Sequence, residues 1–179
     1  AIPTALEIVD TVGYGASGPS QKQQQATAQA CQQADVVLLV LHARNPARQT
    51  DLNQVKLLKE HFEKNPSLHC PPILALMTHI DLLSPALEWS PPYDWRNPMR
   101  AKEKSIAEAV LEIQAQFATF ISGVIPVCTS VSKVYGINEW LLPALANVMN
   151  QAQAVAFLRC LKNEADRDKA RRVFDQLLA

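Results

Sequence analysis

Long apolar runs and an excess of charge of one sign are both missing from this sequence of 179 residues. The longest unbroken aliphatic run, Val36 to Leu41, has six residues, which is too short for a transmembrane helix or the core of a signal peptide. Seventeen Lys and Arg residues are balanced by 17 Asp and Glu residues, so no net charge attracts nucleic acid or an acidic membrane to the whole surface. We therefore expect no membrane segment in this chain and no nucleic-acid partner.

Cysteine is also scarce. The four cysteines, at positions 31, 70, 128 and 160, form no C-x-x-C pair and have no histidine at zinc-finger spacing. We expect them to be reduced, mostly buried thiols in a cytoplasmic protein. His69 and Cys70 are adjacent, but neighbours in an extended segment point to opposite sides, so they predict no metal site.

Only five glycines are present, and three of them, Gly13, Gly15 and Gly18, lie in one loop. The sequence contains no G-x-x-x-x-G-K-[S/T] segment, so this chain cannot build the backbone cradle that such a loop forms around nucleotide phosphates. The sequence begins at Ala1 in place of Met and continues directly into an apolar strand pattern. We expect it to be either a processed protein or a piece of a longer one.

Strand and helix patterns alternate along the chain. Apolar runs predict strands at 5–10, 36–41, 73–78 and 124–128, and periodic apolar positions predict helices at 20–34, 50–64, 106–120, 138–149 and 166–178. This order predicts an α/β fold of three layers, with a mostly parallel sheet and helices on both faces. We expect the four strands to be neighbours in one sheet.

The segment 84–98 interrupts this alternation. It holds four of the twelve prolines and two of the three tryptophans. Because proline restricts φ and lacks a backbone N–H, we expect an excursion outside the sheet. Its aromatic residues, Trp89, Tyr93 and Trp95, are either anchors for a protein partner or a lid that folds back on the domain, and the sequence leaves both interpretations open.

The glycine-rich loop, Gly13-Tyr14-Gly15-Ala16-Ser17-Gly18, fits the G-x-G-x-x-G pattern of dinucleotide-binding proteins. That pattern also requires an acidic residue at the end of the next strand to hold the ribose. Here Asp35 precedes the strand and Arg44 follows it. An arginine there favours a 2′-phosphate, so a dinucleotide-binding enzyme stays open as a weaker hypothesis.

Three other polar loops follow predicted strands. The first is Asp10-Thr11-Val12-Gly13, the second is Thr78-His79-Ile80-Asp81, and the third is Cys128-Thr129-Ser130, after which Gly136 opens a helix. In this order they resemble the nucleotide-binding motifs of bacterial P-loop GTPases of the translation-factor-related, Era-like group, which is related to dynamin-like proteins. The resemblance covers about residues 6–149.

The resemblance implies an incomplete Ras-like G domain at residues 1–150, missing its N-terminal Walker A part, and a C-terminal helical extension at 151–179. The bound cofactors would be GTP or GDP and Mg²⁺. The residues that it assigns to nucleotide binding are Asp10, Gly13, Thr78, His79, Asp81, Thr129 and Ser130. Asp10 would hold Mg²⁺ through water, Gly13 would sense the γ-phosphate, and Asp81 would accept hydrogen bonds from the guanine base.

Two positions depart from the family pattern. His79 replaces the lysine that normally covers the base, and an imidazole covers less area, so we expect a loss of affinity. Tyr14 stands where some members place a glutamine that orients water, and we assign it no catalytic role.

Two classes of function are therefore predicted. The first is a guanine-nucleotide switch that hydrolyses GTP in an intact parent protein. The second is a nucleotide-free interaction module on a GTPase scaffold. In the fold of this family the absent Walker A part also supplies a central strand of the sheet. Without that strand, sheet edges stay unpaired, which predicts pairing with another copy of the chain.

Overall fold

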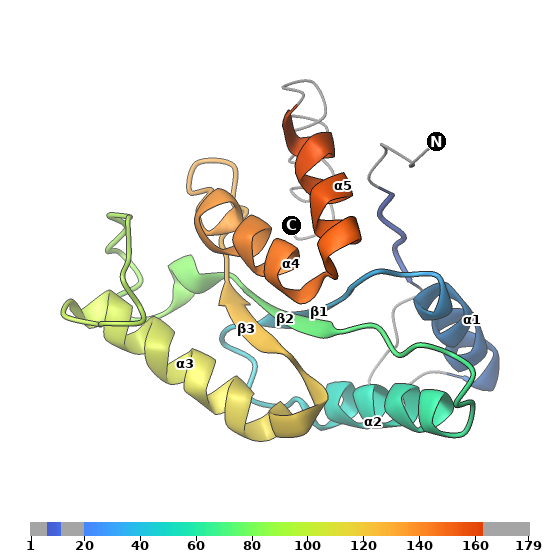
Figure 1. Ribbon diagram of the computed structural model, residues 1–179. Helices are drawn as coiled ribbons and strands as arrows, with labels where there is room; N and C mark the ends of the chain where they lie inside the picture. The colour runs from blue at the N-terminus through green and yellow to red at the C-terminus, as the bar shows by residue number, and fades with distance from the viewer. Residues whose placement is uncertain (1–6, 12–19, 163–179) are drawn as a thin grey trace.

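The computed structural model describes residues 7–11 and 20–162, which build a parallel β-sheet covered by helices (Figure 1). The strands β1 (Val37–His42), β2 (Ile73–Thr78) and β3 (Gly123–Pro126) lie in the order β1-β2-β3. Both neighbouring pairs are parallel, and His42 lies opposite Thr78 in the register. The predicted α/β fold is confirmed, and the three strands predicted at 36–41, 73–78 and 124–128 are found within two residues of their expected bounds.

The strand predicted at 5–10 is wrong for the residues that the structure describes. Residues 7–11 belong to no strand, so three of the four expected strands form the sheet. Ile8 is half-buried against the hydrophobic cluster that contains Leu74 and Leu76, whereas Val9 is 62% exposed. An apolar run becomes a strand only where a neighbouring strand satisfies its backbone groups, and no described segment is paired with 7–11. The glycine loop at 13–18 lies outside the described residues.

Five helices lie within the described part of the chain. They are α1 (Gln21–Gln32), α2 (Gln49–Glu63), α3 (Ala101–Phe117), α4 (Leu142–Val148) and α5 (Gln151–Lys162). A π-helical turn over Ile137–Leu141 leads into α4. The helix predicted at 166–178 lies outside the described residues.

Local signals explain where two helices begin. Ser20 caps α1 as expected: its Oγ accepts a hydrogen bond from the Gln23 N–H at 3.3 Å, and the Gln23 side chain accepts one from the Ser20 N–H at 2.7 Å. The helix expected at 106–120 begins earlier, at Ala101, because Glu103 accepts a hydrogen bond from the Arg100 N–H and so closes the first turn.

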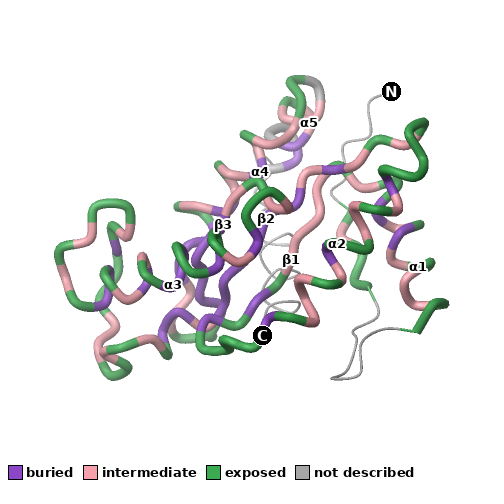
Figure 2. The backbone as a smooth tube through the Cα atoms, turned by 90° about the horizontal axis from the view of Figure 1, so that it is seen from below, coloured by how far each residue is buried: buried purple, intermediate pink, exposed green. Residues whose placement is uncertain are grey.

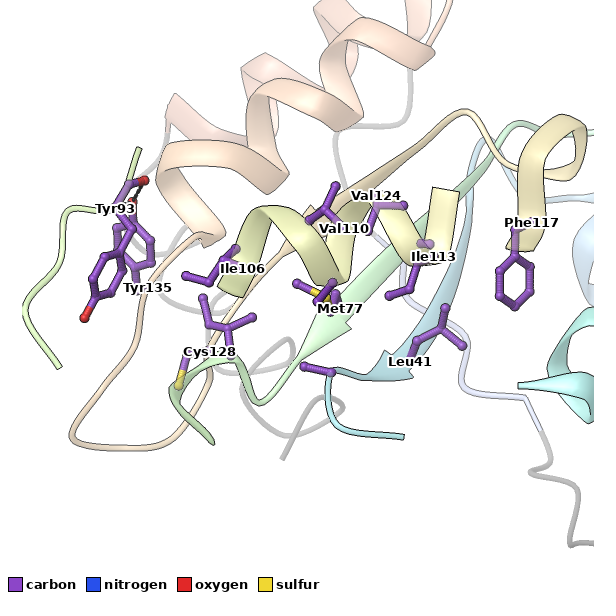
Figure 3. Close-up of a cluster of buried hydrophobic side chains, with 14 of the residues drawn as sticks. Leu41, Met77, Tyr93, Ile106, Val110, Ile113, Phe117, Val124, Cys128 and Tyr135 are labelled. Atoms are coloured by element: carbon purple, nitrogen blue, oxygen red, sulfur yellow. Dashed lines mark hydrogen bonds between the residues drawn. The ribbon is translucent and has the colours of Figure 1, made fainter. Parts of the chain in front are cut away.

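The central strand β2 is buried along its whole length and separates two hydrophobic clusters. The cluster between the sheet and the helices α2 and α3 includes Ile73, Ala75 and Met77. The cluster between the sheet and the helices α4 and α5 includes Leu74 and Leu76. Figure 3 shows the first cluster, in which side chains of α3 meet those of the strands. Figure 2 shows that burial is concentrated in β2, β3 and α3, whereas β1 is mostly half-buried. The predicted three layers are therefore present.

The segment 84–98 contains no helix or strand, as expected, and its aromatic residues fold back on the domain. Tyr93 is 1% exposed, and its N–H donates to the Tyr135 hydroxyl at 2.9 Å, which donates in turn to the Tyr93 carbonyl at 3.0 Å. Trp89 and Trp95 are partly buried against the same cluster. The lid interpretation describes this structure, and Tyr93 offers no surface to a partner.

No disulfide joins the four cysteines; Cys31, Cys128 and Cys160 are buried and Cys70 is half-buried, in line with the expectation of mostly buried thiols. Among the described helices, none is long and apolar enough to cross a membrane.

Candidate functional site

The carboxyl ends of the three parallel strands share one edge of the sheet, and the predicted loops after β2 and β3 meet there. A pocket of about 300 Å³ lies between them, at the small end of the range for small-molecule sites. Its walls are formed by His79, Asp81, Leu82, Cys128, Thr129, Ser130 and Val131. Four of the seven residues predicted from the sequence therefore line one pocket: His79, Asp81, Thr129 and Ser130. They come from two loops that are far apart in the chain, since 47 positions separate Asp81 from Cys128.

The backbone after β2 turns sharply to present Asp81. His79 adopts a left-handed conformation, with φ of 59°, and Ile80–Leu82 form a single 3-10 turn. A non-glycine residue in this region is uncommon and strained. Thr78, which is 2% exposed, supports the turn from inside, because its hydroxyl donates to the Leu41 carbonyl at 3.2 Å. Thr78 thus positions the loop and does not line the pocket.

Among the residues that the structure describes, Asp81 is the only carboxylate that lines the pocket, and it is 7% exposed. Lys133 Nζ lies 3.3 Å from its Oδ2, and the Cys128 thiol donates to its Oδ1 at 3.4 Å. Burial, reinforced by the negative charge of Asp81, raises the pKa of Cys128 to about 11. The thiol therefore stays protonated at neutral pH and acts as a donor.

Lys102 holds this loop in place from α3. The residue has no exposed surface, and its ammonium group donates to three backbone carbonyls, those of Asp81 at 2.7 Å, Leu83 at 2.6 Å and Pro85 at 3.2 Å. Burial lowers the pKa of Lys102, and the nearby Asp81 partly opposes that effect. Three charge-assisted hydrogen bonds compensate the ammonium for its lost hydration.

Lys102 and Lys133 were missed by reasoning from the sequence. A signal for Lys102 exists, because it lies four residues before Ile106 and eight before Val110, on the apolar stripe of α3. A lysine on a buried helical stripe is rarely buried without a specific partner. Lys133 has no comparable signal, since it lies in a loop. The ring of Trp89 lies 5.9 Å from its Nζ, so the aromatic segment also borders this site.

The first predicted loop does not join the pocket. Asp10 is exposed and lies in no strand, and Figure 1 shows residues 7–11 on the side of α1, away from the carboxyl ends of the strands. The expectation that a strand delivers Asp10 to this edge is wrong, because that strand is not formed. Gly13 lies outside the described residues. Within the described ranges, no group of three or more His, Cys, Asp or Glu side chains is arranged to hold a metal ion.

Comparisons of the chain with protein-family models, curated proteins and solved structures gave no match.

Proposed function

We propose that this chain binds the guanine base of a nucleotide in the pocket between the loops after β2 and β3. The observation that carries the proposal is the buried Asp81 carboxylate in a pocket that Cys128–Val131 also line. Guanine presents two adjacent donors, N1–H and the 2-amino group, that one carboxylate can accept together. Adenine offers no such pair.

The partners that Asp81 already has are compatible with a bound base. A carboxylate offers about four lone-pair sites on its two oxygens, and Lys133 and Cys128 use one each. Leu82 and Val131 add apolar surface to the pocket. Val131 is 99% exposed, so covering it with a flat base removes apolar area from water.

We further propose that the chain is part of a GTP-binding switch, an incomplete Ras-like G domain that resembles the Era-like bacterial GTPases. GTP hydrolysis with Mg²⁺ is proposed for the intact parent protein, because this sequence has no Walker A segment. Asp10 is left out of the proposed site, since it lies away from the pocket.

The direct test is a titration followed by NMR chemical shifts, with guanosine, inosine and adenosine at millimolar concentrations. Inosine lacks only the 2-amino group of guanine. We expect guanosine to bind more tightly than inosine and inosine more tightly than adenosine, with shifts at His79, Asp81 and Ser130. Equal affinities for the three nucleosides would contradict base recognition by Asp81.

A second test reverses the preference. Asp81→Asn replaces one acceptor by an amide donor, and xanthine presents N1–H beside a carbonyl at position 2. We expect this variant to bind xanthosine more tightly than guanosine. Because the reversal is a gain of binding, it cannot result from unfolding, and a circular dichroism melt of the variant provides the control.

A further inference from the structure

A second pocket borders the proposed guanine site. It has a volume of about 320 Å³ and is lined by Arg44, Leu82, Leu83, Ser84 and Ala86. Leu82 lines both pockets, so the two are neighbours. Asp81 lines the first pocket and Arg44 lines the second, so a ligand that spans Leu82 lies between a residue of negative charge and one of positive charge.

Two stacked histidines adjoin the first pocket, which one of them, His79, lines. His42 ends β1 and His79 follows β2, and their ring centroids are 4.3 Å apart with an interplanar angle of 17°. The Arg44 N–H donates to His42 Nδ1 at 3.1 Å. Since a backbone N–H can only donate, neutral His42 carries its proton on Nε2. His42 is exposed, so its Nε2–H remains available as a donor, and Arg44, whose N–H it accepts, lines the second pocket.

The hydrogen bonds of Thr78 define the other ring. Thr78 has one hydroxyl proton, and it donates that proton to the Leu41 carbonyl. The contact of 2.9 Å between Thr78 Oγ1 and His79 Nδ1 therefore has His79 as the donor. His79 is thus oriented by its own strand, and it lines the guanine pocket while its face stacks on His42.

The charged groups around His42 favour the binding of an anion. Burial lowers the pKa of His42, electrostatic interactions with His79, Arg44 and Arg48 lower it further, and Asp81 opposes them. A phosphate placed between Arg44 and His42 meets a guanidinium and an N–H donor, which are the groups that bind phosphate well.

We propose that Arg44 and His42 bind the phosphate of a guanine mononucleotide whose base lies against Asp81. This inference rests on the proposed function. It assigns part of the phosphate recognition to residues at the end of β1 of this chain, with no Walker A loop required. Arg44 supplies the charge, His42 supplies the Nε2–H donor, and Leu82 lies beneath the ribose that joins the two ends.

The experiment compares guanosine with guanosine 5′-monophosphate by NMR titration at low salt. One charge-assisted contact predicts a monophosphate affinity about tenfold above that of the nucleoside. In Arg44→Gln we expect this gain to fall to about twofold, the remainder coming from His42, with guanosine affinity unchanged. Lys64→Gln removes the same charge at the far end of α2 and is expected to retain the full gain.

The outcomes separate the two proposals. If guanosine binds and the monophosphate binds no more tightly, the phosphate site is refuted while base recognition stands. If the gain survives Arg44→Gln, or is lost equally in Lys64→Gln, a general attraction explains it and the assignment to Arg44 fails. If neither ligand binds at millimolar concentration, the proposed function itself is refuted.

Discussion

At the scale of single residues, the site depends on two lysines that contact Asp81, one at its backbone carbonyl and one at its carboxylate. Lys102 holds the backbone of the Asp81 loop through three carbonyls, and Lys133 pairs with the Asp81 side chain. The two lysines act differently, because Lys102 is fully buried while the Lys133 side chain is 34% exposed. The first determines where Asp81 lies, and the second compensates its charge.

Lys102→Met should destabilise the protein more than an exposed substitution on the same helix. The change leaves three carbonyls without their donor, and each buried unsatisfied group costs about 1–3 kcal/mol. Because water can hydrate some of these carbonyls, we expect the free energy of unfolding to fall by roughly 2–4 kcal/mol. Urea denaturation measures this free energy. Lys104→Met is the matched control, because Lys104 is exposed two positions away, and similar losses in both variants would contradict the role of Lys102.

Glu103 gives the fold a defined response to acid. Its carboxylate accepts hydrogen bonds from the Arg100 side chain first, and then from backbone N–H groups of Arg100, Asp94 and Met99, which together lower its pKa from 4.5 to about 2. A lowered folded-state pKa means stabilisation that is present above pH 4.5 and is lost as the pH falls toward 2. We expect urea midpoints of the wild type to fall more steeply across this interval than those of Glu103→Gln. Parallel curves for the two proteins would refute the assignment.

At the scale of elements, the shape of the pocket depends on the loop that connects β3 to the following π-helical turn. β3 ends at Pro126, and an antiparallel bridge between Cys128 and Tyr135 closes the loop that holds Thr129 and Ser130. Gly136 then starts the π-helical turn with φ of 90°. That turn packs against the end of β3, so the geometry of one wall of the pocket depends on this glycine.

Gly136→Ala should be strongly destabilising. Its φ lies in the left-handed region, and an added Cβ would collide with the Pro126 carbonyl oxygen and lie 3.2 Å from Val127 Cα. We expect a loss of at least about 2 kcal/mol, seen as a lower melting temperature. Gly123→Ala is the control, because its Cβ would meet only Leu74 Cδ2 at 3.8 Å. The prediction fails if both variants melt at similar temperatures.

At the scale of the whole molecule, the sheet has a free edge. β1 pairs with β2 on one side, and within the described residues no strand pairs with its other side. Val40 in this strand is 47% exposed. Exposed edge strands with apolar residues tend to pair with other chains, which supports the expected self-association.

We therefore expect concentration-dependent dimerisation by light scattering. Val40→Lys places a charge on this edge and should reduce the dimer fraction several-fold, since an edge lysine opposes strand pairing. Leu111→Lys, which changes an exposed residue of α3, should leave the fraction unchanged. A wild-type chain that stays monomeric at all concentrations would contradict the prediction.

The chain as a whole should bind GTP weakly and hydrolyse none. Without a Walker A cradle it lacks several charge-assisted hydrogen bonds of about 1.5–3 kcal/mol each, and every 1.4 kcal/mol is about tenfold in affinity. A fluorescent guanine nucleotide with Mg²⁺ should therefore show no saturation at micromolar concentration. Tight binding that Asp81→Ala abolishes would show that another segment binds the phosphates, and tight binding of NADPH would favour the glycine-loop hypothesis.

The sequence by itself determined the positions of the three strands in the sheet and of two loops of the site. The runs at 36–41 and 73–78 are apolar on both faces, which is the local pattern of strands buried between helices, and the polar residues Thr78 to Asp81 directly follow one of them. Ser20 likewise predicted the start of α1, because a capping interaction involves only residues close in sequence. These features depend on short-range patterns.

Only the tertiary structure decided those features that depend on contacts between residues far apart in the sequence. Residues 7–10 look like a strand in sequence, but a strand requires a neighbour, and they have none among the described residues. The choice between a lid and a docking surface for Tyr93 depended on Tyr135, 42 positions away. Lys102 and Lys133 converge on Asp81 from α3 and from the loop after β3. A buried charge is tolerated only where such partners meet it, and their meeting is a property of the folded chain.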